Sequence, residues 1–501
     1  MKDLFLFVRP PRPLWPMNSP ASAFWPPLAF ASLAAMLREQ VRDLGVEILD
    51  APILEMGWRT LASELARRRP TYVGMGEEAV SCTEGLRLAA LAKAVGARVI
   101  AGGCFFGHVA PEVLRTGLVD VVVHGEGERT IVELVEALRS GGSGSLRQVA
   151  GISFRNGDEI VQTALRPLIE DLDRLPMPAY DLLPVERYGR RSRNHPRFAA
   201  IELGRGCVSS CNYCVLWRQM GKMADGRLTP HLRVKSPERL REEVHRLVRQ
   251  HGRGYLGWVD PTFNAHPDVP GQLAERLLRD GLRIGQSAWM RADALRRDAA
   301  SGALAACVEA GLNEIYLGLE RPDDASLARL GKRTTVADAR AALEILREHF
   351  PQVLTIGSFI YGLPEDTPAD IRAMHRLAFE LQLDQFFFIP HTPLPGTPGW
   401  HSALWDATGR AFRDFNFLPT GRRHSELAAL ERALLWSVLF HWPAARWRVY
   451  GRRLFQGDAR KRRVSWRLVA RGAKLHAKCL WRRLWGEDDQ SLMIFPSWYE
   501  R

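Results

Sequence analysis

The chain has 501 residues, of which 46% are hydrophobic and 25% are charged, and its formal net charge is +13. This length exceeds that of one ordinary core and predicts two or three domains, while the composition excludes a largely disordered chain. No apolar run approaches the roughly 20 residues of a transmembrane helix, and the apolar start lacks the small-residue cleavage site of a signal peptide. We therefore expect a cytoplasmic protein.

Residues 1–145 alternate short apolar runs with segments of helical spacing. The runs are LFLFV (4–8), VEILDA (46–51), YVGMG (72–76), RVIAGG (98–103) and VDVVVHG (119–125). They predict a doubly wound α/β domain in which helices cover both faces of a five-stranded parallel sheet. Ligands of such sheets bind beyond the carboxyl ends of the strands. No GxGxxG with a following acidic residue is present, so we do not expect a dinucleotide.

Residues 146–194 are expected to form a linker with a small hairpin that turns at Asn156-Gly157. The alternation resumes over residues 195–400. Its strands are predicted at FAAIELG (198–204), YLGWVD (255–260), RIGQSAWM (283–290), EIYLGLE (314–320), LTIGSFIYG (354–362) and LDQFFFIP (383–390). Six β/α units in succession predict a partial (β/α)6 barrel of the TIM type, with its active residues at the carboxyl ends of the strands.

Three of the seven cysteines, Cys207, Cys211 and Cys214, occupy eight positions directly after the first barrel strand. A structural zinc ion takes four ligands, and no further Cys or His stands close enough in the sequence to complete that set. A [4Fe–4S] cluster held by only three thiolates leaves one iron open for a substrate or cofactor. Three packing cysteines are the remaining alternative, but a polar, glycine-flanked loop is a poor place for them.

The segment Cys207-Val-Ser-Ser-Cys211-Asn-Tyr213-Cys214 resembles the signature of the radical S-adenosylmethionine (SAM) superfamily, CxxxCxxC with an aromatic residue before the last cysteine. The GRG lead-in and the stretches GGCFFGHVAPEVL, DLDRLPMPAYDLLP and FIYGLPEDT resemble members that carry an N-terminal cobalamin-binding domain. This resemblance implies that SAM binds the open iron. An external electron donor would drive its cleavage to methionine and a 5′-deoxyadenosyl radical, which takes a hydrogen atom from an unactivated substrate carbon.

The resemblance also implies further SAM contacts at the strand ends. They are the Tyr213 backbone and the Gly362-Leu363 stretch at the adenine, Arg291 at the carboxylate and Glu320 at the ribose, with Asp260 as an additional candidate. Arg291 and Glu320 have a purely structural alternative, in which they form a salt bridge across the barrel mouth.

The first domain lacks DxHxxG, the motif whose histidine binds cobalt from below in many cobalamin proteins. His108 and His124 are the only histidines on the relevant loops. The resemblance therefore implies that cobalamin is held without a histidine ligand by two loops, which comprise Gly102, Gly103 and Cys104, and Gly125, Glu126, Gly127 and Glu128. Ordinary strand-to-helix turns are the alternative for both glycine pairs.

Residues 401–501 are expected to form a helical basic region. Fourteen Lys or Arg and a single acidic residue, Asp458, lie between Arg446 and Arg483. An apolar stripe recurs there at helical spacing, formed by Trp466, Val469, Ala473, Leu480 and Leu484. Such a helix suits the surface of an anionic membrane, or it packs its stripe on the barrel.

RNA is the third alternative for this basic region. The radical SAM methylthiotransferases that modify tRNA carry extra N-terminal cysteines for a second cluster, and Cys82 and Cys104 are too few. We therefore do not expect a nucleic-acid partner.

Together these features predict a cobalamin-dependent radical SAM enzyme that methylates an unactivated carbon of a small-molecule or lipid-like substrate. An enzyme of the same architecture that closes a ring or rearranges a skeleton without methylation is the nearest alternative. A cobalamin-responsive binding protein is the alternative from another class, although such a sensor has no use for an open iron.

Overall fold

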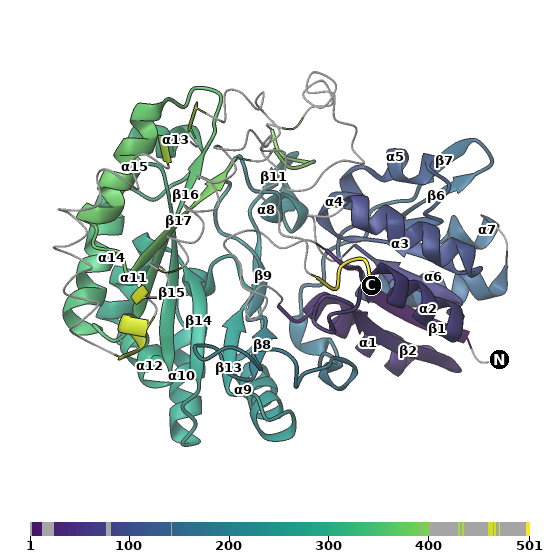
Figure 1. The fold of residues 1–501 in the computed structure, drawn as a ribbon, viewed down its shortest axis with the longest axis horizontal. Coiled ribbons are helices and arrows are strands. Elements are labelled where there is room, and N and C mark those ends of the chain that lie inside the picture. Colours follow the sequence, from purple (N-terminus) through teal and green to yellow (C-terminus); the bar gives the residue numbers. More distant parts are fainter. Residues whose placement is uncertain are drawn as a thin grey trace.

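The computed structural model describes residues 3–12, 25–76, 82–141, 143–391, 393–398 and 400, and in the C-terminal part residues 429–430, 433–434, 459–463, 465–466, 470 and 497–501. The chain forms two α/β units that lie side by side, a sheet domain and a barrel domain (Figure 1). Within the described residues, no helix combines the length and the apolar character needed to cross a bilayer.

The sheet domain contains the five parallel strands that the sequence predicts. They are β1 (Asp3–Arg9), β2 (Leu44–Asp50), β3 (Tyr72–Met75), β4 (Arg98–Ala101) and β5 (Val121–Val123), in the spatial order β2-β1-β3-β4-β5. The strand order reverses direction between β1 and β3. In doubly wound sheets a ligand crevice opens at such a switch point, beyond the carboxyl ends of the strands.

Two further strands extend this sheet. The predicted hairpin is present as β6 (Ile152–Asn156) and β7 (Glu159–Gln162), and β6 pairs antiparallel with β5. The hairpin therefore belongs to the sheet domain and not to a separate linker. Its physical role is clear, because it covers the backbone groups that the edge of β5 would leave unpaired.

Helices cover both faces of the sheet because successive side chains of each strand point to opposite sides. Phe5 and Phe7 of β1 pack in the core formed with α1 and α6, whereas Leu6 and Val8 pack in the core formed with α2 and α3. The helices of this domain are α1 (Leu28–Gln40), α2 (Trp58–Arg68), α3 (Cys82–Ala94), α4 (Gly103–His108), α5 (Ala110–Arg115), α6 (Glu128–Ser140) and α7 (Ser143–Leu146).

The barrel domain contains the six predicted parallel strands. Its parallel strands are β8 (Phe198–Ile201), β13 (Tyr255–Trp258), β14 (Gly285–Met290), β15 (Leu312–Glu320), β16 (Leu354–Tyr361) and β17 (Gln385–Pro390), arranged in that order. Its helices are α9 (Pro237–His245), α10 (Val269–Arg279), α11 (Ala292–Ala300), α12 (Ala303–Glu309), α13 (Asp324–Arg329), α14 (Val336–His349) and α15 (Pro368–Glu380).

An insertion between β8 and α9 was not predicted. It consists of β9 (Gly204–Gly206), α8 (Leu216–Gln219), β10 (Lys222–Ala224), β11 (Arg227–Thr229) and β12 (Leu232–Val234). β9 pairs antiparallel with β12, and β10 pairs with β11. These strands have three residues each, so they are too short to show the alternation from which strands are predicted.

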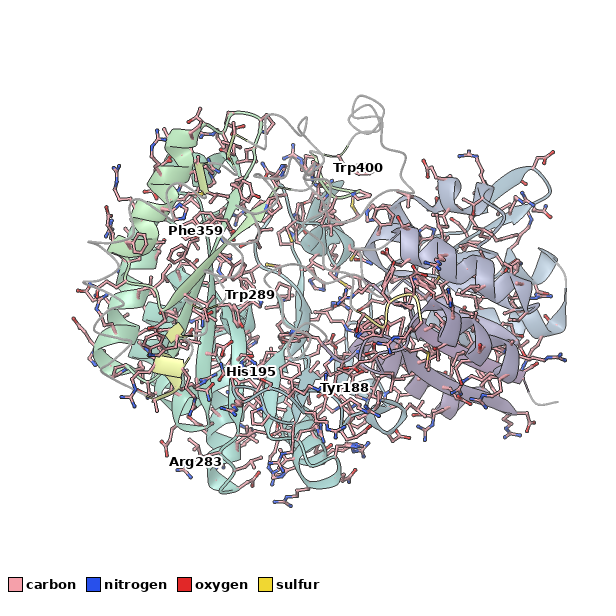
Figure 2. All side chains as sticks on the ribbon, in the orientation of Figure 1. Tyr188, His195, Arg283, Trp289, Phe359 and Trp400 are labelled. Atoms are coloured by element: carbon pink, nitrogen blue, oxygen red, sulfur yellow. The ribbon has the colours of Figure 1, made fainter. Side chains whose placement is uncertain are left out.

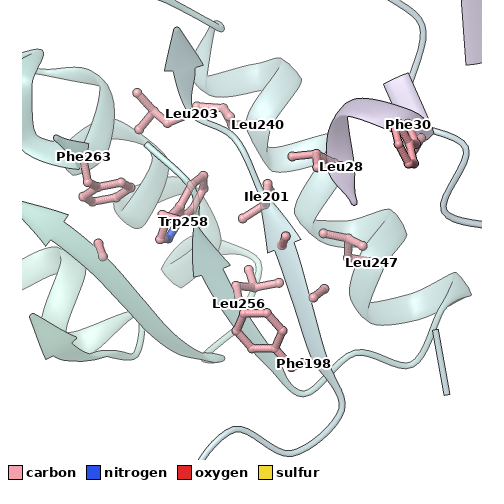
Figure 3. Close-up of a cluster of buried hydrophobic side chains, with 14 of the residues drawn as sticks. Leu28, Phe30, Phe198, Ile201, Leu203, Leu240, Leu247, Leu256, Trp258 and Phe263 are labelled. Atoms are coloured by element: carbon pink, nitrogen blue, oxygen red, sulfur yellow. The ribbon is translucent and has the colours of Figure 1, made fainter. Parts of the chain in front are cut away.

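The two domains share one continuous apolar core. Leu28 of α1 lies beside the barrel residues Ile201 and Leu247 (Figure 3), and Phe30 of the same helix packs on Phe7 of the sheet domain. A buried polar contact adds direction to this packing, because the hydroxyl of Tyr188, labelled in Figure 2, donates to Asp50 Oδ2 at 2.6 Å. The joint between the domains is therefore packed like a protein interior.

Parts of the C-terminal region dock on the amino end of the barrel. Arg460 donates to Glu314 Oε2 at 2.8 Å, and Lys461 pairs with Asp384 at 2.9 Å. Trp466 is half exposed. The other members of the predicted apolar stripe, Val469, Ala473, Leu480 and Leu484, lie outside the described residues. Two basic residues thus neutralise barrel carboxylates, and the rest of the basic region stays a prediction.

Residues 497–501 return to the sheet domain and cap α2. The carbonyl of Tyr499 accepts from Trp58 N at 3.0 Å, and Arg501 O accepts from Arg59 N at 3.0 Å and Thr60 N at 3.1 Å. These amides belong to the first turn of the helix, where no intrahelical acceptor exists. No side chain caps α2 at Gly57, so a distant segment of the chain satisfies its first amides.

We predict that Gly57→Ala displaces this segment. A Cβ atom at Gly57 would stand 2.0 Å from Trp498 O, so the segment must move and leave the first amides of α2 without these acceptors. The free energy of unfolding of the sheet domain should fall by about 1–3 kcal/mol in chemical denaturation. Gly144→Ala is the matched control, because open space surrounds that position, and should change stability by less than about 0.5 kcal/mol. Equal effects of the two changes would contradict the capping role.

Candidate functional site

The three clustered cysteines lie on one loop at the mouth of the barrel, between β9 and α8. Cys207 is buried, and Cys211 and Cys214 are half-buried. Asn212, in the middle of the loop, makes two hydrogen bonds that hold it in place. Its backbone N donates to Leu330 O at 2.9 Å, and its side-chain Nδ2 donates to Arg329 O at 2.7 Å. A short turn after α13 therefore fixes the middle of the loop.

The thiols have the chemistry of cluster ligands. The amide of Ser209 donates to Cys207 Sγ at 3.4 Å, so this sulfur is held in place within the loop. Burial raises the pKa of Cys214 to about 11 and also raises the pKa of Cys211, so iron binding must displace both protons. In the described part of the chain, no three His, Cys, Asp or Glu side chains converge on a position for one metal ion. A cubane does not need such convergence, because each thiolate binds a different iron, and the donor set fits a [4Fe–4S] cluster.

The two glycines of the GRG lead-in allow β9 to approach β12 closely. A Cβ atom at Gly204 would stand 2.3 Å from Arg233 O, and one at Gly206 would stand 1.8 Å from His231 O. Gly206 also has a positive φ of 94°, which side chains with a Cβ disfavour. The lead-in thus has a steric reason, because it brings Arg205 and Arg233 together directly before the cysteine loop.

Arg291 follows the end of β14 and reaches the cysteine loop, while its contact with the carboxylate of SAM stays a prediction. Its guanidinium donates to Ser209 Oγ and pairs with Asp293, with an Nη2–Oδ2 distance of 2.5 Å. Burial would lower the pKa of Arg291, but the bond to Asp293 and the thiols of Cys207 and Cys211 raise it. The guanidinium of Arg291 is therefore a positive charge that Asp293 holds beside the cysteine loop.

Glu320 ends β15 and also faces this site. Its backbone has a positive φ of 63°, and Lys332 Nζ donates to its Oε1 at 2.8 Å. Arg291 and Glu320 thus have separate partners in this structure and do not form the direct salt bridge considered as an alternative. Tyr213 completes this side, and burial raises the pKa of its hydroxyl well above the ordinary value.

The Gly362-Leu363 stretch is fixed by a buried ion pair. Both backbone amides donate to Asp366 Oδ2, at 2.7 and 3.0 Å, and Asp366 pairs with Arg321 at 2.5 Å. The backbone of this stretch is therefore rigid beside the ends of β15 and β16.

Asp260 binds the backbone that leads into the cysteine loop. It accepts hydrogen bonds from Leu203 N at 2.9 Å and Gly204 N at 2.7 Å, and burial raises its pKa to about 7. Both carboxylate oxygens are thus engaged by the backbone that leads into the cysteine loop, so Asp260 supports β9 in this structure. A direct contact of Asp260 with SAM stays a prediction.

An aromatic group lies deeper in the barrel, on the opposite face of the sheet from the helix-packed core. Trp289, which is labelled in Figure 2, stacks on Tyr316 with ring centroids 5.0 Å apart and meets the edge of Phe387 at 6.3 Å. All three side chains are half-buried. Alternation along parallel strands places them on the inner face, below Arg291 and Glu320. The barrel interior therefore offers an apolar surface beneath a charged mouth.

The loop after β4 in the sheet domain meets the insertion of the barrel. Gly102 and Gly103 begin α4, and the thiol of Cys104 contacts Gln219 Oε1 of α8. Burial raises the pKa of Cys104 to about 11, and the nearby Cys214 adds to this shift. Cys104 thus lies on the side of its loop that faces the cysteine loop.

The two histidines of this edge both have partners. His124 Nε2 lies 2.7 Å from Ser153 Oγ, and burial lowers the pKa of its ring. His108 Nδ1 lies 2.7 Å from Cys104 O, and the other side of its ring packs against Gly396 of the barrel domain. Gly125 has a positive φ of 67° with open space beside it, which fits the close approach of a large ligand to the backbone.

A buried ion cluster joins the loop after β5 to the barrel. Arg205 donates to Glu126 at 2.9 Å and to Glu128 at 2.6 Å, and Arg233 donates to both oxygens of Glu126, at 3.0 and 2.9 Å. Burial would raise the pKa of Glu126, but the two arginines outweigh burial and lower it. The side chains of Glu126 and Glu128 therefore hold the domain interface, and only the backbone of this loop is left for the predicted cobalamin contact.

Sequence reasoning missed several residues of this site. Lys332, Asp366, Arg205 and Arg233 were not named as site residues, and the role of each is recognised only through its partner. Arg205 lies in the quoted lead-in GRG and Asp366 in the quoted stretch FIYGLPEDT, so these two had a signal in the sequence.

Comparison with known proteins decides the family. Residues 201–378 match the family model described as the radical SAM superfamily, and residues 16–135 match the B12 binding domain. The chain is a radical SAM enzyme with a B12-binding domain. A [4Fe–4S] cluster and SAM therefore belong to its barrel, and cobalamin belongs to its sheet domain.

Two curated relatives of this radical SAM enzyme differ in the reaction that their names give. One is an uncharacterized methyltransferase of Pyrococcus horikoshii, 29% identical over 382 residues that cover 76% of this chain and 78% of the relative. The other is an anaerobic magnesium-protoporphyrin IX monomethyl ester cyclase of Cereibacter sphaeroides, 28% identical over 446 residues that cover 85% of this chain and 69% of the relative.

A solved structure confirms the fold. The radical SAM methyltransferase TsrM from Kitasatospora setae matches with a TM-score of 0.60 and 18% identity, over 77% of this chain and 73% of TsrM. At this identity the match shows the architecture of the sheet domain and the barrel.

We predict that the ion cluster is the strongest polar contact between the domains. Glu126→Ala leaves Arg233 buried without its carboxylate and should lower the free energy of unfolding by about 3–5 kcal/mol at pH 7. The pKa of Glu126 is lowered on folding, so its contribution is present at neutral pH and is lost as the pH falls through the acid range. Denaturation curves of the full chain, measured from about pH 7 down to about pH 3, test both effects.

Glu159→Ala is the matched control, because it removes the exposed pair of Glu159 with Arg147. It should cost roughly 0–1 kcal/mol. A loss for Glu126→Ala as small as that of the control would show that the interface does not depend on this cluster.

Proposed function

We propose that this radical SAM enzyme methylates an unactivated carbon of a small-molecule or lipid-like substrate. When bound, the cluster and SAM supply radical hydrogen abstraction, and cobalamin supplies a transferable methyl group. The observation that carries the proposal is the ion cluster of Arg205 and Arg233 with Glu126, which turns the carboxyl edge of the sheet domain toward the cysteine loop. Cofactors held at the two edges would therefore face a common space.

The residues at the barrel mouth have distinct roles in this proposal. Cys207, Cys211 and Cys214 hold the cluster. Arg291, already oriented by Asp293, offers a cation to the carboxylate of SAM, and the fixed backbone at Gly362 borders its adenine. The aromatic surface of Trp289, Tyr316 and Phe387 excludes water and suits an apolar part of the substrate.

The proposed absence of a histidine ligand to cobalt in the sheet domain supports methylation. The domain lacks DxHxxG, and His124 Nε2 is already engaged by Ser153, so cobalamin would bind with no protein side chain on the lower face of the cobalt. A cobalt without a strong lower ligand is easier to reduce to the state that accepts a methyl group. The backbone around Gly102 and Gly125 would then make the main contacts.

Ring closure without methylation is the second candidate. The named cyclase covers 85% of this chain, a larger share than the named methyltransferase covers. The same cysteine loop and cofactors would serve both reactions, so the product distinguishes them.

Membrane contact through the basic region 446–483 is also proposed, on the basis of its charge pattern.

The first prediction from this proposal concerns the cluster. Protein reconstituted without oxygen should hold about four irons per chain, and Ala at Cys207, Cys211 or Cys214 should abolish the visible absorbance of the cluster. Cys307→Ala is the control, because that buried thiol only donates to Pro270 O at 3.4 Å. Equal loss of iron in the control would contradict the ligand assignment.

The second prediction concerns the reaction. The enzyme is loaded with methylcobalamin and supplied with a reductant and SAM that carries an isotopic label on its methyl group. Mass spectrometry of lipid and small-molecule extracts from a deletion strain supplies the candidate substrates. We expect the label in the product and no change in the cobalamin spectrum on His108→Ala or His124→Ala.

Three results would contradict parts of this proposal. A nitrogen ligand to cobalt that disappears in either histidine variant contradicts the absence of a lower ligand. Failure to bind cobalamin contradicts the use of the sheet domain. Product without label, formed while 5′-deoxyadenosine accumulates, contradicts methylation and supports ring closure.

A further inference from the structure

The turn after α13 lies directly against the cysteine loop. Besides the two bonds from Asn212, Gly331 approaches the loop with a positive φ of 67°. A Cβ atom at Gly331 would stand 3.3 Å from Ser210 O and 3.7 Å from Cys211 Cα. The backbone of this turn therefore supports the loop on the Cys211 side, and Lys332 is the next residue.

The side chain of Lys332 turns away from solvent and crosses to β15. Its Nζ donates to Gly318 O at 2.6 Å and to Glu320 Oε1 at 2.8 Å. A Cβ atom at Gly318 would stand 2.7 Å from Nζ, so the ammonium group lies close against this glycine. Lys332 thus connects the support of the cysteine loop with the end of β15.

Two cations flank the cysteine loop. Arg291 lies on the side of Ser209, where Asp293 binds it through both carboxylate oxygens. Lys332 lies on the side of Cys211. It follows Gly331, which contacts the backbone of Ser210 and Cys211, and its ammonium group pairs with Glu320 at 2.8 Å. Removing the lysine would therefore remove a positive charge and leave the Glu320 carboxylate without this partner on the same side of the loop.

Charge at this place matters because three thiolates and a cluster form a buried anion. One-electron reduction makes that anion more negative, and Coulomb attraction to a nearby cation grows in proportion. Hydrogen bonds and local charge are established controls of the potentials of iron–sulfur clusters. A residue that fixes the loop and supplies a cation would therefore act on reduction as well as on geometry.

We infer that Lys332 is a positioning residue that fixes the cysteine loop against β15 and supplies a positive charge that favours the reduced cluster. The inference rests on the proposed assignment of Cys207, Cys211 and Cys214 as the cluster ligands. In the reduction step one electron passes from an external donor, dithionite in the experiment, to the cluster. The donor is oxidised, and no bond forms or breaks on the protein.

The test is a redox titration of the reconstituted protein, followed by electron paramagnetic resonance. Lys332→Met should lower the ratio of reduced to oxidised cluster about tenfold at a fixed potential, which is about 59 mV for a one-electron couple. Lys332→Arg keeps the charge and should stay within about threefold of the wild type by the same reasoning. Arg333→Met is the matched control, because it removes an exposed cation at the neighbouring position, and should leave the ratio unchanged.

Glu320→Gln provides a second measurement if Lys332→Met fails to retain iron. It removes the negative partner of Lys332 and should shift the ratio in the opposite direction, toward the reduced cluster. Loss of structure alone does not produce opposite shifts in two partners of one ion pair.

The inference is overturned if Lys332→Met leaves the ratio unchanged, if Lys332→Arg lowers it as far as Lys332→Met, or if Glu320→Gln shifts it in the same direction. Wild-type protein that assembles no cluster would give a different failure, since it would contradict the ligand assignment itself. The two failures are therefore distinguishable in the same preparation.

Discussion

The arrangement of the whole site depends on the buried ion pairs of Arg205 and Arg233 with Glu126. Apolar packing between α1 and the barrel brings the domains together, but such packing has little directional preference. Buried charges are costly unless their hydrogen bonds are satisfied, so this cluster tolerates few relative orientations of the domains. Arg205 also stands two positions before Cys207. The same hydrogen bonds that orient the domains therefore also fix the position of the cysteine loop relative to the sheet domain.

The barrel mouth repeats one device at successive strand ends. Each cation there is held by a carboxylate, as in the pairs Arg291–Asp293, Lys332–Glu320 and Arg321–Asp366. A cation that is already oriented loses little conformational freedom when it meets a ligand. The pairs also leave few charges to be desolvated alone when cofactors enter. The mouth is thus organised in advance for anionic groups, while the aromatic residues below it offer an apolar surface.

Much of this architecture was predictable, and the failures have a common physical cause. Long parallel strands with helices between them show strong periodicity, and CxxxCxxC is specific enough to locate the cluster loop. Arg291 and Glu320 were named as SAM contacts through the family resemblance, and that role stays a prediction. The pairing of β9 with β12, the contact of Lys332 with Glu320 and the use of Glu126 at the interface depend on partners that are distant in sequence and leave no local pattern. For the basic region, the few described contacts, such as Arg460 with Glu314, show barrel packing and leave the membrane expectation open to experiment.

The return of residues 497–501 to α2 has a consequence for how the protein is made. During synthesis the N-terminal domain of a chain generally folds first, as soon as it leaves the ribosome. Here the amides of Trp58, Arg59 and Thr60 receive their acceptors only when a segment more than 400 residues later has been translated. The sheet domain would therefore emerge early, persist as an unfinished nascent structure, and reach its final form after the barrel that follows it.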